Sequence, residues 1–157
     1  MPALFTKAFS ERLNDCCKLK VKEVTDNEFV EQSTVYVARG GAQLMVEKES
    51  GTDKHILKID EITKTIYKPN VNITFDSVVD AFAPNIIGVI LTGMGNDGAK
   101  GMRRIKDAGG ITIAEDESTT VIFGMPKAAI ENGSVDYVLP SDQIAEKIIA
   151  LVKERNL

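Results

Sequence analysis

The spacing of apolar residues changes along the chain, and each spacing predicts a different element. Residues 3–14 repeat apolar side chains at helical intervals, which predicts an amphipathic helix. Residues 18–24 and 34–41 alternate apolar and polar side chains or are rich in β-branched residues, and both segments are typical of strands. The apolar face of the predicted helix consists of Leu4, Phe5, Ala8, Phe9 and Leu13.

A β-hairpin is predicted for residues 43–60. Alternating apolar residues flank the sequence Ser50-Gly51-Thr52-Asp53, and these residue types favour a tight reversal of the chain. We expect this hairpin at an exposed edge of the sheet.

From residue 72 onward, helical and strand patterns alternate. A helix is predicted for residues 72–83, ending at Pro84, and the uniformly apolar run 86–92 (IIGVILT) is typical of a central parallel strand. The later elements are a helix at 98–108, a strand at 111–116, a helix at 125–133, a strand at 136–140 and a helix at 141–156. This alternation predicts a three-layer α/β/α fold with a mostly parallel, Rossmann-like sheet and an edge hairpin.

Length and charge limit the classes of function. The chain has 157 residues, 43% of them apolar, which fits one domain over residues 1–157. With 19 basic and 23 acidic residues, its formal net charge of −4 gives no footprint for nucleic acid or an anionic membrane. No signal sequence or long apolar segment is present, so we expect a cytoplasmic protein that does not insert into membranes.

The two cysteines are adjacent in the sequence. Cys16 and Cys17 cannot close a loop with each other, and this usage suits a reducing compartment. We expect two free thiols at the end of the first helix.

The segment LTGMGNDGAKG, residues 91–101, is the most unusual stretch of the chain, because it places four glycines where a buried strand meets a helix. Functional groups collect at the carboxyl ends of parallel strands. Gly93 and Gly95 allow a sharp turn, Gly98 opens the helix, and Asp97 is expected to cap it. An equally simple interpretation gives these residues only turning and capping roles. A phosphate cradle is less favoured, since neither glycine-rich phosphate motif is present and Asp97 would repel a phosphate.

Two long segments resemble a known family. LTGMGNDGAKGM and AGGITIAEDESTTVIFGMPKAAIENGSVDYVLP are similar to the carboxyl-terminal half of the chemotaxis-receptor methylesterases, the CheB-type protein-glutamate methylesterases and glutaminases. Upstream segments, including VYVARGGAQL and VNITFDSV, follow the family order, so the resemblance covers essentially the whole chain. It implies hydrolysis of glutamate methyl esters, and deamidation of glutamines, on the cytoplasmic helices of chemoreceptors. No cofactor and no metal are expected.

The same resemblance assigns roles to residues of the glycine-rich turn. The family uses a Ser-His-Asp triad whose acid matches Asp97, where the carboxylate would orient the histidine. Met94 corresponds to the oxyanion region, through its backbone amide. The residues expected to line the pocket are Gly93, Gly95, Asn96 and Met125.

The serine and the histidine of this triad are expected to be absent from this chain. The family places them in a G-A-S-x-G-G loop and an H-M-P block, and residues 1–6 match the segment that directly follows that histidine. The only histidine, His55, lies in the predicted hairpin, and no serine has a glycine-flanked elbow. The serines considered were Ser10, Ser33, Ser50, Ser77, Ser118, Ser134 and Ser141.

We therefore expect an amino-terminally truncated catalytic domain that lacks the first two strands of the family fold and is inactive by itself. A truncated gene, a misassigned start at Met1 or an incomplete fragment would each explain this sequence. The alternatives are a non-catalytic receptor-binding module and, less favoured, an anion- or nucleotide-binding α/β domain.

Overall fold

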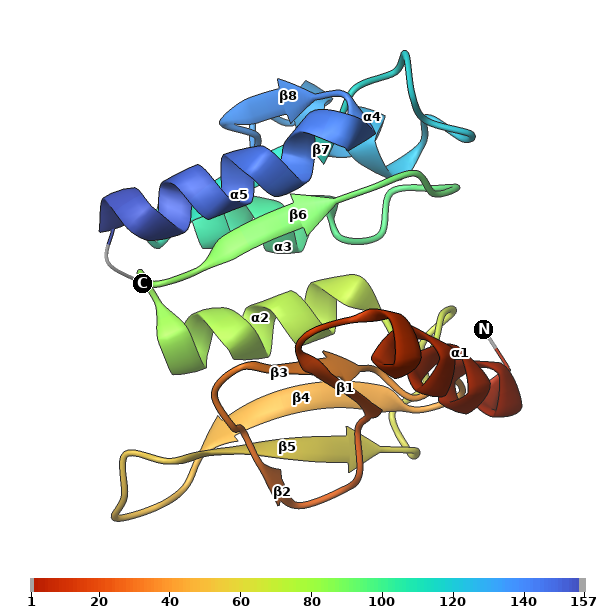
Figure 1. The fold of residues 1–157 in the computed structure, drawn as a ribbon, viewed down its shortest axis with the longest axis vertical. Coiled ribbons are helices and arrows are strands. Elements are labelled where there is room, and N and C mark those ends of the chain that lie inside the picture. The colour runs from red at the N-terminus through yellow and green to blue at the C-terminus, as the bar shows by residue number, and fades with distance from the viewer. Residues whose placement is uncertain (1, 156–157) are drawn as a thin grey trace. The chain divides into compact units, whose positions relative to one another are not determined.

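The computed structural model describes residues 2–155, and the chain divides into two compact units, Met1–Ser77 and Val78–Leu157 (Figure 1). Asn156, the last residue of the predicted closing helix, lies outside the described residues. Among residues 2–155, no helix combines the length and the hydropathy needed to span a bilayer.

The first unit combines a helix with short strands in two small sheets. Its elements are α1 (Ala3–Cys16), β1 (Lys20–Glu23), β2 (Glu28–Phe29), β3 (Thr34–Val37), β4 (Gln43–Lys48), β5 (His55–Asp60) and the first part of α2 (Val71–Phe82).

The predicted hairpin is confirmed as the antiparallel pair β4 and β5, with Gln43 opposite Asp60. Its turn contains Gly51 at φ 80°, a left-handed conformation that glycine adopts without strain. Sequence analysis missed β2, whose two residues pair with Ile56 and Leu57 and make β5 the middle strand of the sheet β2-β5-β4. β1 and β3 form a separate parallel pair.

The helix predicted for residues 3–14 is confirmed as α1, but most of its apolar face is exposed in this structure. The exposed fractions of Leu4, Phe5 and Phe9 are 88%, 54% and 41%, whereas Thr6 and Ser10 are buried. The Thr6 hydroxyl accepts a hydrogen bond from the Gly40 amide at 3.0 Å and donates one to Glu23 at 2.5 Å. These two hydrogen bonds attach the buried face of α1 to β1 and to the loop after β3. Cys16 and Cys17, both free and exposed, lie at its end as expected.

Buried Gln43 attaches β4 to the start of α2. Its amide nitrogen donates to the Asn70 carbonyl at 3.1 Å and to the Thr74 hydroxyl at 3.0 Å, and its oxygen accepts from the Asn70 amide at 2.7 Å. Because each amide atom has a partner, this polar side chain is buried without an unpaired group.

The second unit is a three-layer α/β/α structure, which confirms the predicted fold class. Its strands β6 (Ile87–Ile90), β7 (Ile111–Glu115) and β8 (Tyr137–Leu139) are parallel, in the order β6-β7-β8. The helices α3 (Ala99–Asp107) and α4 (Met125–Glu131) contact β6 and β7, and α5 (Ser141–Arg155) packs on β7 from the other face (Figure 1). In the described sheet β7 is central and wholly buried, and β6, expected at the centre, is an edge strand.

Two apolar layers cover the faces of β7. Ile111 and Ile113 pack against Ile144 and Leu151 of α5. On the α3 side, Ile105 is 1% exposed and lies against two glycines. A Cβ added at Gly88 would lie 2.8 Å from its Cδ1 atom, and one at Gly110 would lie 2.6 Å from its Cγ2 atom. The two glycines therefore provide the space that this side chain fills.

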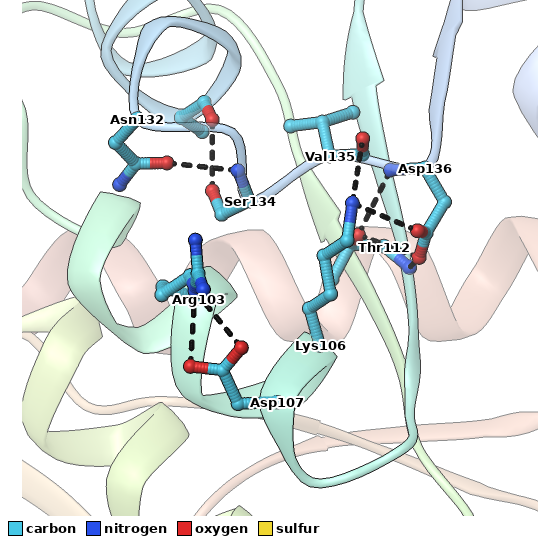
Figure 2. A network of polar contacts seen from close by, with 9 residues as sticks. Arg103, Lys106, Asp107, Thr112, Asn132, Ser134, Val135 and Asp136 are labelled. Carbon is cyan, nitrogen blue, oxygen red and sulfur yellow. Dashed lines mark hydrogen bonds and ion pairs between the residues drawn. The ribbon is translucent and has the colours of Figure 1, made fainter.

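A polar network closes the amino-terminal end of the sheet (Figure 2). Both the amide and the hydroxyl of Thr112 donate to Asp136 Oδ2 at 2.9 Å, and Lys106 Nζ lies 3.0 Å from Asp136 Oδ1. Partial burial alone would raise the pKa of Asp136, but the hydrogen bonds from Lys106 and Thr112 outweigh it, and the net pKa is lowered.

We expect Ile105→Ala to lower the free energy of unfolding by about 2–5 kcal/mol, because the cavity between the two glycines cannot collapse fully. The matched control is Ile149→Ala, since Ile149 is 56% exposed on α5 and should change stability by less than about 1 kcal/mol. Urea unfolding measures both changes. Equal effects of the two substitutions would contradict the packing described for Ile105.

Asp136→Asn should destabilise the protein at neutral pH by about 1–3 kcal/mol, through the lost charged hydrogen bonds. Since the folded pKa is below the unfolded one, the carboxylate stabilises the fold above about pH 4 and loses this contribution as the pH falls through the folded pKa. The difference between the variant and the unsubstituted protein should therefore shrink on acidification. Thermal unfolding from pH 7 to pH 3 tests this, with Asp107→Asn, in an exposed pair with Arg103, as the control.

Candidate functional site

The glycine-rich turn after β6 is joined to the loop that follows β7. Gly93 donates its amide hydrogen to the Ile122 carbonyl at 3.0 Å. Its own carbonyl accepts from the amides of Gly124 at 3.1 Å and Met125 at 2.8 Å. Both the turn at residues 92–98 and the segment at residues 122–125 follow parallel strands of the sheet. These three backbone hydrogen bonds join them in one junction.

This junction requires glycine at position 124, and at position 93 the space beside the backbone is taken by the Met125 side chain. A Cβ at Gly124 would lie 2.7 Å from the Gly93 carbonyl oxygen and 2.9 Å from the Gly95 amide nitrogen. A Cβ at Gly93 would lie 2.4 Å from Met125 Sδ. The two backbones approach more closely than any side chain would allow, and the Met125 thioether covers Gly93.

Asp97 lies at the end of this turn and is buried, with 8% of its surface exposed. Its Oδ1 atom accepts a hydrogen bond from the Gly98 amide at 3.0 Å, which orients the carboxylate. The expected N-cap position is corrected: the cap residue is Gly98, at φ 90° in the left-handed region, and not Asp97. Asp97 is therefore the residue immediately before the cap, where Gly98 turns the chain into α3.

The other predicted site residues lie in the same turn and loop. Met94 has an exposed side chain, 75% accessible, and Gly95 and Asn96 are also exposed. Met125 lies across from them at the start of α4. The structure thus brings Met94, Asp97 and Met125 into one region of the second unit, while their chemical roles stay predictions.

Sequence analysis missed Glu115, the last residue of β7, which is only 4% exposed. Its Oε2 atom accepts from the Thr92 amide at 2.8 Å, and its Oε1 atom accepts from the Thr119 hydroxyl at 3.0 Å. The Thr119 oxygen in turn accepts from the Ser141 amide at 3.0 Å, at the start of α5. The signal in the sequence was an acid at the end of a strand that is otherwise apolar except for Thr112, since a buried carboxylate requires partners.

Ser118, considered as a substitute nucleophile, has a local structural role. Its amide and hydroxyl donate to Asp116 Oδ1 at 2.9 Å and 2.5 Å, and the hydroxyl bond is the main cause that lowers the pKa of Asp116. Three other serine hydroxyls donate to nearby carbonyls, namely Ser10 to Lys7, Ser77 to Thr74 and Ser134 to Ala129. Ser10 and Ser77 thus bond to carbonyls of their own helices, and Ser134 bonds to a carbonyl of α4, which it follows.

Two further kinds of site find little support. The Gly98 and Ala99 amides, which an anion at the start of α3 would use, already donate to Asp97 and to the Asn96 carbonyl. In the part of the chain that the structure describes, no group of three His, Cys, Asp or Glu side chains is placed to hold a metal ion.

The second unit contains the buried acid Asp97, but its sequence has no histidine and no cysteine. His55 is the first residue of β5 in the first unit, paired opposite Lys48. A fixed carboxylate beside a turn with close backbone approach can orient a base and present amides to a developing negative charge, but it cannot supply a nucleophile.

The sequence of this chain was compared with protein families and with known proteins. The family model described as CheB methylesterase matches residues 1–148. A protein-glutamate methylesterase/protein-glutamine glutaminase from Caldanaerobacter subterraneus subsp. tengcongensis is 44% identical over 98% of this chain and 42% of its own length. One from Archaeoglobus fulgidus is 47% identical over 98% of this chain and 44% of its own length. The chain thus spans less than half the length of these relatives.

A solved structure agrees with both the sequence match and the fold. The crystal structure of the Thermotoga maritima CheB methylesterase catalytic domain has a TM-score of 0.91 and 44% sequence identity, covering 97% of this chain and 80% of that one. Fold, order of motifs and sequence identity therefore agree, and the chain belongs to the CheB methylesterase family.

Proposed function

We propose that this chain is the acid-bearing part of a protein-glutamate methylesterase and glutaminase that acts on chemotaxis receptors in the cytoplasm. The observation that carries the proposal is buried Asp97, held by the Gly98 amide in a turn that the segment 122–125 fixes. Family membership supports the reaction class, and the names of the relatives support a protein glutamate or glutamine as substrate.

In the proposed reaction, a serine oxygen attacks the ester carbonyl while a histidine takes its proton. The tetrahedral intermediate then expels methanol, which receives that proton, and water hydrolyses the acyl-enzyme to the glutamate side chain. Asp97 orients the histidine and stabilises its charged form, and the Met94 amide donates to the oxyanion. Asp97 and Met94 come from this chain, whereas the serine and histidine come from a segment encoded upstream.

A second candidate, a receptor-binding module without turnover, is favoured by exposed apolar side chains around the same turn. Val121 is 87% exposed and Ile122 is 50% exposed, on the loop that pairs with Gly93. Leu91 and Met94 are 49% and 75% exposed on the turn itself. Several large apolar side chains exposed on neighbouring segments are typical of a protein-binding site.

The decisive experiment compares this chain with a longer protein extended upstream in the native reading frame. Methanol release from methylated receptor membranes should occur only with the longer protein. Asp97→Asn in the longer protein should lower kcat by about 10²–10⁴-fold, because the histidine loses its orienting partner. Asp107→Asn, an equal change on the exposed side of α3, should leave the rate unchanged.

Methanol release by this chain alone would contradict the proposal that it lacks a nucleophile and a base. A longer protein that binds receptor membranes but releases no methanol would favour the binding module. Full activity of Asp97→Asn would remove Asp97 from the triad.

Gly124→Ala should also lower activity in the longer protein, by about tenfold or more, because the new methyl group would displace the turn that carries Met94 and Asp97. Gly133→Ala is the control: Gly133 has φ 73° but open space around its Cβ position, so alanine adds backbone strain far from the turn in sequence without a clash. Kinetics and thermal unfolding of both variants separate a site effect from general destabilisation. A loss of rate in Gly133→Ala equal to that in Gly124→Ala would argue against the junction.

A further inference from the structure

We infer that Glu115 is a positioning residue, which holds the turn carrying Asp97 in place through the backbone amide of Thr92. The catalytic part of this inference rests on the proposed function, whereas the positioning part concerns the turn alone.

The position of Glu115 in the sheet holds its carboxylate in one place. It ends β7, the central strand, whose five residues are all buried between helices and flanked by strands on both sides. Its carboxylate lies at the same end of the sheet as the turn that follows β6, and each of its oxygens has a donor. A side chain packed in this way has little freedom to change rotamer, so its oxygens can define the place of their partners.

Thr92 links the Glu115 carboxylate to the glycine-rich turn. Its amide donates to Glu115 Oε2 at 2.8 Å, immediately before Gly93. Its hydroxyl accepts from the Ile122 amide at 2.9 Å and lies 3.3 Å from the Ile122 carbonyl. Thr92 is thus held from β7 through its backbone and from the following loop through its side chain.

The second oxygen of Glu115 holds the other side of the site. Thr119 donates its hydroxyl hydrogen to Oε1 and accepts from the Ser141 amide, so the loop after β7 is attached to the start of α5. One carboxylate therefore connects the ends of two strands, the loop and a helix. Loss of this group would leave the Thr92 amide without its partner, and the turn would gain freedom just before Gly93.

The substitutions separate positioning from charge and from bulk. In Glu115→Gln, the amide oxygen can accept from Thr92 while the NH₂ group donates to Thr119, whose hydroxyl oxygen has a second lone pair. Glu115→Leu removes both acceptors at similar volume. Glu115→Asp keeps the charge but shortens the side chain by one methylene, which moves the carboxylate away from Thr92 and Thr119. It replaces the leucine variant in the test if that variant fails to fold. Glu117→Leu, two residues on and exposed, is the matched control.

Two measurements test the inference. Amide hydrogen exchange in this chain should accelerate at Thr92 by about tenfold or more in Glu115→Leu and Glu115→Asp, while Ile113 within β7 stays protected. In the longer protein, kcat for methanol release should fall about 10- to 100-fold with KM within about twofold, since the substrate surface is kept and the catalytic geometry is lost. Glu115→Gln and Glu117→Leu should match the unsubstituted protein in both measurements.

Each contrary result has a defined meaning. Unchanged exchange at Thr92, or an equal rise at Thr92 and Ile113, would overturn the positioning role. Faster exchange at Thr92 with unchanged kcat would overturn its catalytic relevance, and a glutamine variant as impaired as the leucine variant would exclude hydrogen bonding as the cause. If the unsubstituted longer protein releases no methanol, the proposed function fails, and hydrogen exchange alone still decides whether Glu115 fixes the turn.

Discussion

The candidate site depends on the carbonyl oxygen of Gly93, which accepts two backbone amides from the segment entering α4. Those bonds bring two segments about thirty residues apart into contact at a distance that leaves no room for a side chain at Gly124. A backbone junction of this kind has few degrees of freedom, because neither partner can rotate away as a side chain can. The buried carboxylate of Asp97 and the exposed Met94 are both carried by one side of this junction.

The two ends of the parallel sheet in the second unit are stabilised by different chemistry. At the amino-terminal end, Lys106, Thr112 and Asp136 form a partly exposed ionic network between α3, β7 and the segment before β8 (Figure 2). At the carboxyl end, Glu115 accepts its hydrogen bonds from one amide and one hydroxyl, both of them uncharged groups. Across the described residues, no buried side-chain nitrogen or oxygen lacks a hydrogen-bond partner. Burial of a polar group in such a network fixes its geometry, since an alternative arrangement would leave groups unpaired.

The pattern of apolar residues predicted most of the fold because burial on a helix or strand imposes a period on the sequence. That is why the hairpin, α2 to α5 and the strands of the second unit were placed correctly to within a few residues. The family motifs likewise led to the turn and to α4. The orientation of α1 could not be predicted, since it depends on hydrogen bonds of Thr6 with Gly40 and Glu23 that are distant in sequence. β2 exists only through its pairing with β5, and the displacement of Asp97 from the cap position follows from the left-handed Gly98.

The packing of Ile105 against Gly88 and Gly110 has a consequence for how this family can vary. At Gly88 the added Cβ would meet only side-chain atoms, so a methyl group gained there requires smaller side chains on α3, above all at position 105. At Gly110 it would also lie 3.0 Å and 3.1 Å from the carbonyl oxygens of Ile105 and Ile86, which no change of side chain relieves. Substitutions at positions 88 and 105 should therefore occur together during divergence, as compensated exchanges that conserve the volume between helix and sheet, whereas position 110 should stay glycine.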